Sequence, residues 1–158
     1  MCNHIGRFIL FTNSTVMFSM QLFKDARYFQ IIFQAIFLGY GIFFLHWHSE
    51  YWLYATYFIT SLAVQFVAEY FLGKKQQPFF QRIKNGIPSV IISSFGLSLL
   101  LKTNYWWVAV IAASVSILSK YILRINGKHI FNPSALGIAV AVLLTGNAWI
   151  SPGQWGSG

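Results

Sequence analysis

The sequence predicts an all-α integral membrane protein with about five transmembrane helices, and two features of the chain support this prediction. Hydrophobic residues make up 56% of the chain and charged residues only 9%, whereas ordinary globular proteins contain about 25% charged residues. The eleven lysines and arginines lie in short clusters between long apolar stretches, a distribution that marks membrane topology and not a nucleic-acid-binding face. We therefore expect a lipid bilayer around the chain and no nucleic-acid partner.

Five apolar stretches are the predicted spans. They are Tyr28–Trp47, Tyr51–Leu72, Gly86–Leu101, Tyr105–Leu123 and Asn132–Ile150. A helix needs about 20 residues to cross the roughly 30 Å of hydrocarbon in a bilayer. The third stretch is shorter and carries Pro88 near its start. We expect it either to cross a locally thinned bilayer or to form a broken or re-entrant helix.

Two shorter segments flank the predicted bundle of residues 28–150. Residues 1–27 are expected to form a cytoplasmic or interfacial segment. The apolar stretch Phe8–Phe23 within it is interrupted by polar residues and is not followed by a signal-peptidase site. Residues 151–158 are expected to form an extracytoplasmic tail. Cys2 is the only cysteine, so the sequence carries no disulfide framework and no cysteine-based metal site.

The basic residues and the tryptophans predict opposite sides of the membrane. Ten of the eleven basic residues fall on one predicted side, and Lys102 falls on the other. The ten are Arg7, Lys24, Arg27, Lys74, Lys75, Arg82, Lys84, Lys120, Arg124 and Lys128. The six tryptophans fall on the side of Lys102, where aromatic rings anchor at the interface. Because basic loops stay in the cytoplasm, we expect a bacterial inner (cytoplasmic) membrane protein with its N-terminus cytoplasmic and its C-terminus outside.

The stretch Gly127–Gly137 predicts that one helix ends, a basic turn follows and a new helix opens. Asn132 is a good N-cap and Pro133 suits the first helical position. The segment is either a plain helix–helix turn or a ligand site at the mouth of the last helix. Basic side chains next to a helix N-terminus favour an anion such as a flavin phosphate or a lipid headgroup, although a topological anchor explains the same charges. The candidate cofactor-binding residues are Lys128, His129, Phe131, Asn132, Pro133 and Ser134.

Glu69 is the clearest ionisable residue within a predicted span, one turn from its cytoplasmic end. Gln65 precedes it by four residues and lies on the same helix face. Charged groups in a bilayer are costly and are therefore functional candidates. Glu69 forms either an interfacial ion pair with Lys74 or Lys75, or a cation or proton site together with Gln65. We keep Glu69 and Gln65 as candidates for an ion or proton path.

The sequence gives little indication of metal binding or catalysis. His46, His48 and Glu50 lie in a short loop with no fourth ligand nearby, so we expect no metal site. Phosphate-binding loops, paired carboxylates and nucleophile–base arrangements are absent from the sequence, and we expect no catalytic residues. Small residues four positions apart mark surfaces where helices pack closely in lipid. Such pairs include Ala109 with Ala113 and Gly137 with Ala141.

Several segments resemble the RnfD/NqrB family of membrane subunits. The segments are Asp25–Ile31, with Ala26 where proline is usual, then Ser119–Arg124, Gly127–Gly137 and Trp149–Gly156. Members of this family belong to the ion-pumping Rnf complex and to the sodium-translocating NADH:quinone oxidoreductase. The resemblance implies a fold of about ten helices, built as two five-helix halves in inverted orientation and similar to urea transporters. It extends over roughly Asp25 to Gly156, which corresponds to the first half of that inverted repeat.

The resemblance implies a function in an electron-transport or ion-translocating complex, with other membrane subunits as partners. In the family a flavin is attached to the threonine of a Ser-Gly-Ala-Thr motif. This motif is absent from the sequence, so the resemblance allows a bound flavin and does not imply a covalent one. The alternatives are a structural accessory subunit of a larger membrane complex, or half of a small-solute channel or transporter. The chain is at most a subunit of an oxidoreductase, since it carries no catalytic motif of its own.

Overall fold

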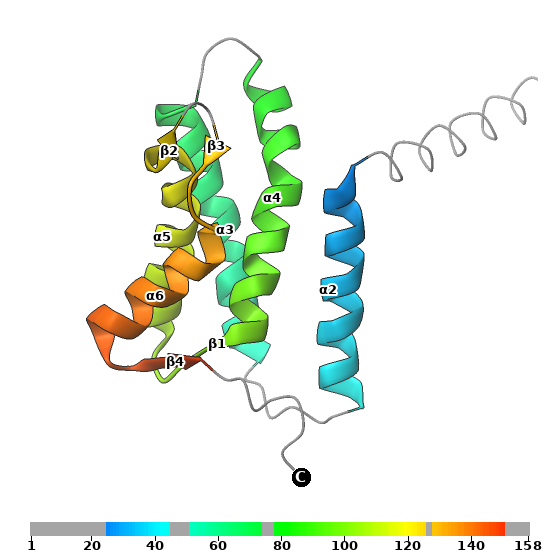
Figure 1. Cartoon of the computed structure of the whole chain (residues 1–158), viewed down its shortest axis with the longest axis vertical. Coiled ribbons are helices and arrows are strands. Elements are labelled where there is room, and N and C mark those ends of the chain that lie inside the picture. Colours follow the sequence, from blue (N-terminus) through cyan, green and yellow to red (C-terminus); the bar gives the residue numbers. More distant parts are fainter. Residues whose placement is uncertain (1–24, 45–50, 74–77, 126–127, 151–158) are drawn as a thin grey trace, which may run out of the picture.

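A computed structural model describes residues 25–44, 51–73, 78–125 and 128–150. In these residues the chain forms five helices and two short two-stranded sheets (Figure 1). The helices are α2 (Ala26–Phe43), α3 (Tyr51–Phe71), α4 (Phe79–Leu100), α5 (Trp106–Ile122) and α6 (Pro133–Thr145). The strands are β1 (Leu101–Thr103), β2 (Arg124–Ile125), β3 (Lys128–His129) and β4 (Ala148–Ile150). The predicted helical class is therefore confirmed, and each of the five predicted stretches overlaps with one helix.

Several predictions fall on residues that the structure does not describe. They concern the apolar stretch Phe8–Phe23, the tail at 151–158, the loop with His46, His48 and Glu50, and the lysines Lys74 and Lys75. Among the described helices, α2 and α4 are long and apolar enough to cross a membrane by length and composition. The number of spans therefore stays a prediction.

Helix α2 packs on the outer side of α4. Asp25 is its N-cap, because the carboxylate Oδ1 accepts a hydrogen bond from the backbone N–H of Arg27 at 3.1 Å. The hydrogen bonds from the Arg27 side chain and backbone hold the pKa of Asp25 below its usual value. Figure 1 shows α2 separated from α5 and α6 by α4. Within α2 only Leu38 and Gly41 are buried, so most of this helix lies outside the core.

The prediction for α4 was wrong at its start. The helix begins at Phe79, well before the predicted Gly86, and it continues through the buried Pro88 without a break. Four of its first seven residues are polar, which is why these residues were not predicted to belong to the apolar span. One of their side chains, Arg82, pairs with Glu69 of α3. Proline is tolerated within membrane helices when neighbouring groups satisfy the carbonyl that loses its partner, so neither a broken nor a re-entrant helix is needed.

The prediction for α6 was wrong at its end. We expected helix to Ile150, but α6 ends at Thr145, because Gly146 adopts a left-handed conformation with φ of 60°. Residues Ala148–Ile150 then pair antiparallel with Leu101–Thr103. With 13 residues, α6 is about 20 Å long, which is less than the hydrocarbon thickness of a bilayer.

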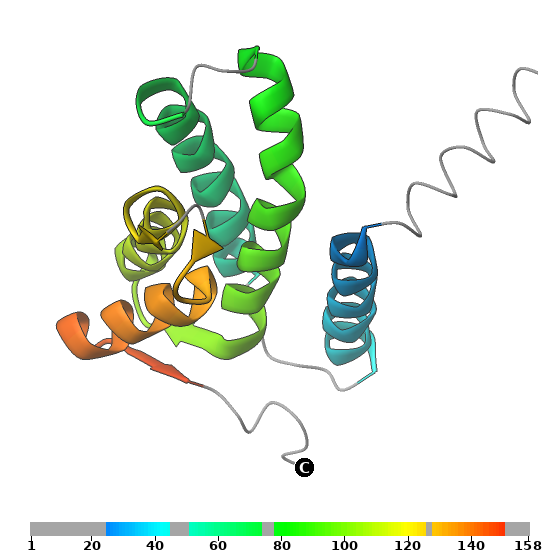
Figure 2. The ribbon, with the colours of Figure 1, turned by 45° about the horizontal axis from the view of Figure 1, so that its top comes forward.

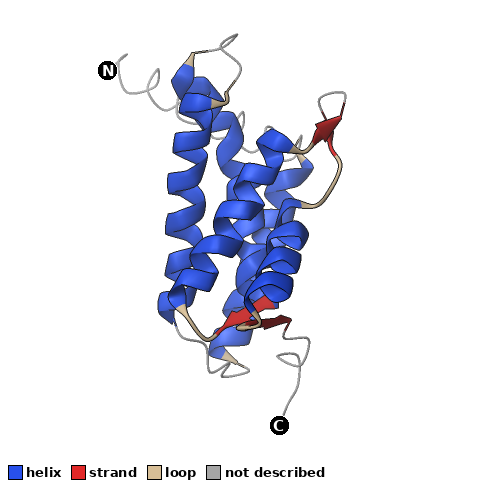
Figure 3. Cartoon of the chain, turned by 90° about the vertical axis from the view of Figure 1, so that its left-hand side faces the viewer, coloured by secondary structure: helices blue, strands red, loops and turns tan. Residues whose placement is uncertain are grey.

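The two short sheets lie at opposite ends of the bundle (Figure 3). We call them the β1–β4 end and the β2–β3 end. Trp52, Trp106 and Trp107 lie in the first turns of α3 and α5, and Trp149 lies in β4, so all four are at the β1–β4 end. Arg82 and Lys84 begin α4 at the other end, and Lys120 lies in the last turn of α5 there. This separation is what the predicted orientation requires, and the orientation itself stays a prediction.

The predicted orientation can be tested with single cysteines in a Cys2→Ser background. A membrane-impermeant maleimide is expected to label the Lys102→Cys variant in spheroplasts. The Lys84→Cys variant should be labelled only after the membrane is permeabilised, because basic ends stay inside. Labelling of both variants in intact spheroplasts would contradict the orientation.

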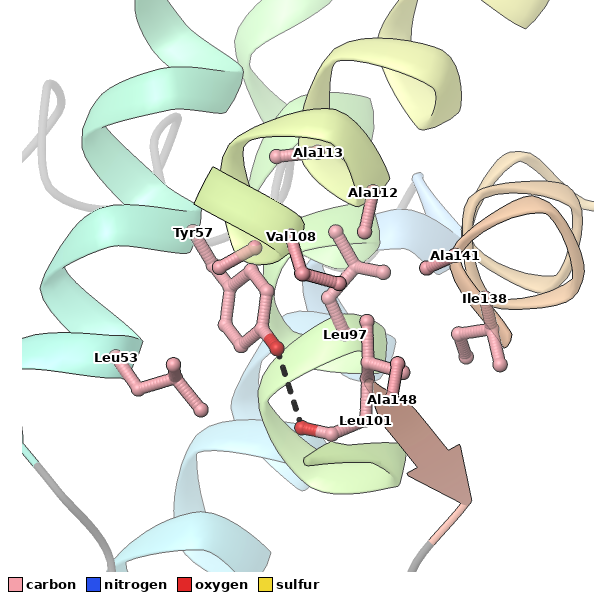
Figure 4. Close-up of a cluster of buried hydrophobic side chains, with 11 residues drawn as sticks. Leu53, Tyr57, Leu97, Leu101, Val108, Ala112, Ala113, Ile138, Ala141 and Ala148 are labelled. Carbon is pink, nitrogen blue, oxygen red and sulfur yellow. Dashed lines mark hydrogen bonds between the residues drawn. The ribbon is translucent and has the colours of Figure 1, made fainter. Parts of the chain in front are cut away.

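The core lies between α3, α4, α5 and α6 (Figure 4). Tyr57 points into it from α3 and donates a hydrogen bond from its hydroxyl to the carbonyl of Leu101 at 3.2 Å. Small side chains let α5 and α6 approach closely: a Cβ on Gly137 would lie 2.5 Å from the carbonyl oxygen of Ala112. The buried Ala109, Ala113 and Ala141 belong to the same cluster. The predicted small-residue pairs on these helices therefore lie in the core.

Candidate functional site

Helix α6 opens inside the bundle and not at its β2–β3 end. A Cβ on Gly96 would lie 2.9 Å from Oγ of Ser134, so the first turn of α6 packs on the second half of α4. Gly137, one turn later, packs against Ala112 and Ser116 near the middle of α5. Figure 2 shows the chain running from β3 into the start of α6. The mouth of α6 is thus surrounded by helices on its inner side.

The backbone at the mouth of α6 has the predicted N-cap and the predicted first helical residue. Asn132 is the N-cap and Pro133 occupies the first helical position, and the Asn132 carbonyl accepts the first helical bond from the N–H of Leu136 at 3.1 Å. The Asn132 side chain does not cap the helix. Its Oδ1 accepts a hydrogen bond from the Ser134 hydroxyl at 3.0 Å instead, so no side chain caps the N–H groups of this first turn.

The predicted cofactor-binding residues divide into two groups. Phe131 and Asn132 are exposed and Ser134 is buried, and together with Pro133 they form the mouth itself. Lys128 and His129 lie on β3, where their backbones pair with Ile125 and Arg124. The backbone thus places the two basic residues on a hairpin that precedes the mouth.

Glu69 is held by three helices. Its Oε1 accepts hydrogen bonds from the hydroxyl of Tyr121 on α5 at 2.7 Å and from Nε2 of Gln65 at 3.3 Å. Its Oε2 lies 3.6 Å from Nη1 of Arg82 on α4, and the same nitrogen donates to the Glu69 carbonyl at 3.1 Å. We call these four residues the Glu69 cluster. The Glu69 and Arg82 side chains are only 13% and 15% exposed, so this is a largely buried ion pair.

The contacts of the Glu69 cluster bear on the two interpretations of Glu69, an ion pair or a cation or proton site. The ion-pair partner within the described residues is Arg82, and Lys74 and Lys75 lie outside them. Since the guanidinium compensates the carboxylate, a cation entering the cluster would have to displace or compete with Arg82. Gly86 makes room for this arrangement, because a Cβ there would collide with Nε2 of Gln65. Gln65 and Glu69 therefore lie in contact, and Arg82 compensates the charge of the Glu69 carboxylate.

Sequence reasoning did not select three residues that the structure places at these sites. Arg82 and Tyr121 meet Glu69 across 13 and 52 residues of sequence. Lys120 was used for the orientation and as part of the resemblance and was given no role of its own, yet it is 4% exposed and its amine donates to the Ser89 carbonyl at 2.9 Å. The polar start of α4 was the one local signal for Arg82, because a charge beside an apolar run needs a partner.

A metal centre is not formed by the residues that the structure describes, since no three of their His, Cys, Asp or Glu side chains gather at one place. The part of the mouth that remains for a cofactor is its uncapped first turn with the Asn132 and Ser134 side chains. These groups offer hydrogen bonds and the positive end of a helix dipole, which suits an anionic or carbonyl-bearing ligand.

Comparison of the chain with protein-family models, with curated proteins and with solved structures gave no match.

Proposed function

We propose that this chain is a membrane subunit, or the first half of one, in an RnfD/NqrB-like electron-transport or ion-translocating complex. The observation that carries the proposal is the short helix α6. It has only 13 residues and begins inside an apolar bundle at the Phe131-Asn132-Pro133 step. This step lies within the segment that resembles the family most specifically. The apolar helices α2 and α4 support a place in the membrane.

The segment before α6 supports a partner in the membrane. Ile130 and Phe131 are 49% and 56% exposed, and no helix includes them. Non-helical backbone at membrane depth is tolerated only where protein buries it or where it lines a water-filled cavity. A second half of inverted orientation, or another membrane subunit, is expected to cover Ile130–Asn132 and to complete the site at the mouth.

In this proposal the mouth faces a flavin, quinone or ion path. The uncapped N-terminus of α6 would stabilise a negative group of the ligand, and Asn132 and Ser134 would orient it by hydrogen bonds. Gln65 and Glu69 would serve an ion or proton path on the side of the β2–β3 end. Arg82 would have to move away from Glu69 whenever a cation is bound there, because one carboxylate cannot compensate the charges of both the guanidinium and the cation.

A second candidate is half of a small-solute channel or transporter, and α6 favours this candidate too. Transporters place substrate and ion sites where discontinuous helices point their ends at the middle of the membrane. The two candidates differ in their chemistry, since only the first needs a redox cofactor.

Purification from bacterial membranes in mild detergent tests the first candidate. We expect flavin absorbance and fluorescence that co-purify with the chain and its partner subunits, and reduction of the flavin by an added electron donor. The absence of flavin and quinone from an intact assembly, combined with solute flux in liposomes, would replace the first candidate by the second.

The Asn132→Leu variant tests the mouth directly. It removes the hydrogen bond between Asn132 and Ser134, and we expect a loss of about 1 kcal/mol in the free energy of unfolding together with weaker flavin retention. The control is Asn85→Leu, which changes an exposed asparagine on α4. Unchanged assembly, flavin content and activity in the Asn132→Leu variant would show that the mouth is not a functional site.

A further inference from the structure

The side chain of Lys120 points into the bundle and not out of it. Lys120 lies in the last turn of α5, at the β2–β3 end, and is only 4% exposed. Its amine donates a hydrogen bond at 2.9 Å to the carbonyl of Ser89, which lies halfway along the 22-residue helix α4. A lysine near the end of a membrane helix usually extends its amine toward the interface and water. The inward orientation therefore calls for a physical reason.

The carbonyl that Lys120 contacts is a weak counterpart for a full positive charge. It is a neutral group, and it also accepts a hydrogen bond from the hydroxyl of Ser93 at 2.9 Å. An ammonium group in apolar surroundings is costly unless an opposite charge compensates it. A neutral amine avoids this cost and still has an N–H group that can donate to the Ser89 carbonyl.

The charged groups of the elements next to α5 do not compensate an ammonium at Lys120. Helices α3, α4 and α6 contain one carboxylate, Glu69, which binds the guanidinium of Arg82 and the hydroxyl of Tyr121. The buried tyrosines of α3 lie in its first two turns, at the β1–β4 end. The other charged or basic residues of elements that contact or follow α5 are Lys84 of α4, Lys102 of β1, and Arg124, Lys128 and His129 of the β2–β3 hairpin.

The Lys120 amine lies between the two sites of the proposed function along α4. Arg82 of the Glu69 cluster precedes Ser89 by seven residues, and Gly96, on which Ser134 packs at the mouth of α6, follows Ser89 by seven. Seven residues are two turns, so these positions share a face of α4 at steps of about 10 Å. This is too far for Lys120 to be a ligand at either site. A unit charge at this distance still changes the proton affinity of an amine on the order of tenfold.

We propose that Lys120 is the proton-binding group of this bundle, and that its amine takes up and releases a proton in the folded protein. Uptake forms one N–H bond at Nζ and turns a hydronium ion into water, and no electron is transferred. Water at the β2–β3 end is the nearest source of the proton, since Lys120 lies in the last turn of α5. A negative charge that appears at the mouth of α6 would favour this uptake.

This inference deepens the proposed function, on which it rests for the presence of an ion or proton path. It assigns the proton to Lys120 and not to Glu69. Protonation of Glu69 would leave the guanidinium of Arg82 without its counter-charge, whereas loss of the proton from Lys120 removes a charge that the described residues do not compensate.

The test measures the unfolding free energy of the full-length chain in detergent between about pH 6 and pH 9. We expect the unaltered chain to gain stability relative to Lys120→Met as the pH rises, because the folded chain gives up a proton that an unfolded lysine keeps until about pH 10. The unfolding equilibrium constant should change by up to about tenfold per pH unit, the limit for one proton. Lys84→Met, which changes an exposed lysine at the same end, should keep the pH dependence of the unaltered chain.

The Lys120→Arg variant separates proton exchange from a structural hydrogen bond. Arginine keeps a charged donor and stays protonated throughout this pH range. We therefore expect Lys120→Arg to be less stable than Lys120→Met and to lack the pH dependence of the unaltered chain. A structural ammonium predicts the opposite order of stability. That opposite order, or the same pH dependence in Lys120→Met as in the unaltered chain, would overturn the proposal.

The double variant Arg82→Met/Glu69→Gln tests the choice between the two candidate proton sites. It removes both charges of the ion pair and should keep the pH dependence that Lys120→Met loses. Loss of the pH dependence in the double variant, combined with its persistence in Lys120→Met, would assign the proton to Glu69.

Nuclear magnetic resonance of the unaltered chain keeps the proposal testable if the Lys120 variants do not fold. With isotopic labels on the lysine side-chain nitrogens, the amine and ammonium forms differ in chemical shift. We expect one lysine to titrate below about pH 9, while exposed lysines stay protonated to about pH 10. Ammonium shifts for every lysine up to about pH 9 would contradict proton exchange at Lys120. These measurements do not involve flavin or electron transfer, so failure of this inference and failure of the proposed function are distinguishable.

Discussion

The Arg82→Met variant is expected to lose about 3 kcal/mol of unfolding free energy, because it leaves the buried carboxylate of Glu69 without its counter-charge. The guanidinium lies 3.6 Å from Oε2 of Glu69 and also binds the Glu69 carbonyl at 3.1 Å. Methionine keeps much of the apolar volume of arginine, so the loss reports the charge and its hydrogen bonds. Denaturant unfolding in detergent, followed by tryptophan fluorescence, provides the measurement.

The exposed pair on α2 is the control for this experiment. Arg27 contacts Asp25 at 2.8 Å, but its side chain is 49% exposed, and water and salt screen such pairs. We expect little change in Arg27→Met. The double variant Arg82→Met/Glu69→Gln should recover part of the stability lost in Arg82→Met, since no uncompensated charge remains. A stability loss in Arg82→Met no larger than that in Arg27→Met would show that the Glu69 cluster does not hold the three helices together.

The Gly137→Ala variant is expected to lose about 2–3 kcal/mol through overpacking. The added Cβ would lie 2.5 Å from the Ala112 carbonyl oxygen and 2.9 Å from Cβ of Ser116. The first of these neighbours is helix backbone and cannot rotate away, so α5 and α6 must separate. The separation would also disturb the mouth of α6, which lies one turn earlier.

Gly39→Ala is the matched control for Gly137→Ala. Gly39 lies within α2, and a Cβ there would meet nothing within 4 Å. Alanine is the better helix former by up to about 1 kcal/mol, so Gly39→Ala is expected to be neutral or stabilising. A loss of stability in Gly137→Ala, combined with unchanged or increased stability in Gly39→Ala, would support a close contact between α5 and α6 at Gly137. Equal stability changes would mean that the helices do not approach at Gly137.

The positions of the helices could be predicted from the sequence, since apolar run lengths and local capping signals determine them. Asn132 and Pro133 marked the start of α6 correctly, because N-cap and N1 preferences depend on the residues themselves. The start of α4 was missed, because its first two turns are rich in polar residues, one of which, Arg82, pairs with Glu69 of another helix. The end of α6 was missed as well. Gly146 takes a left-handed conformation there, and Ala148–Ile150 finds a strand partner in β1.

The sequence by itself determined five helical stretches and the separation of basic residues from tryptophans, because both depend only on the order of apolar and charged residues along the chain. The tertiary structure alone decided which polar groups meet. Tyr121 reaches Glu69 across 52 residues and Lys120 reaches Ser89 across 31. It also decided that α6 begins inside the bundle, because the close approach of Gly96 and Gly137 to neighbouring helices sets its depth. Such contacts depend on how helices distant in sequence pack together, which no local pattern encodes.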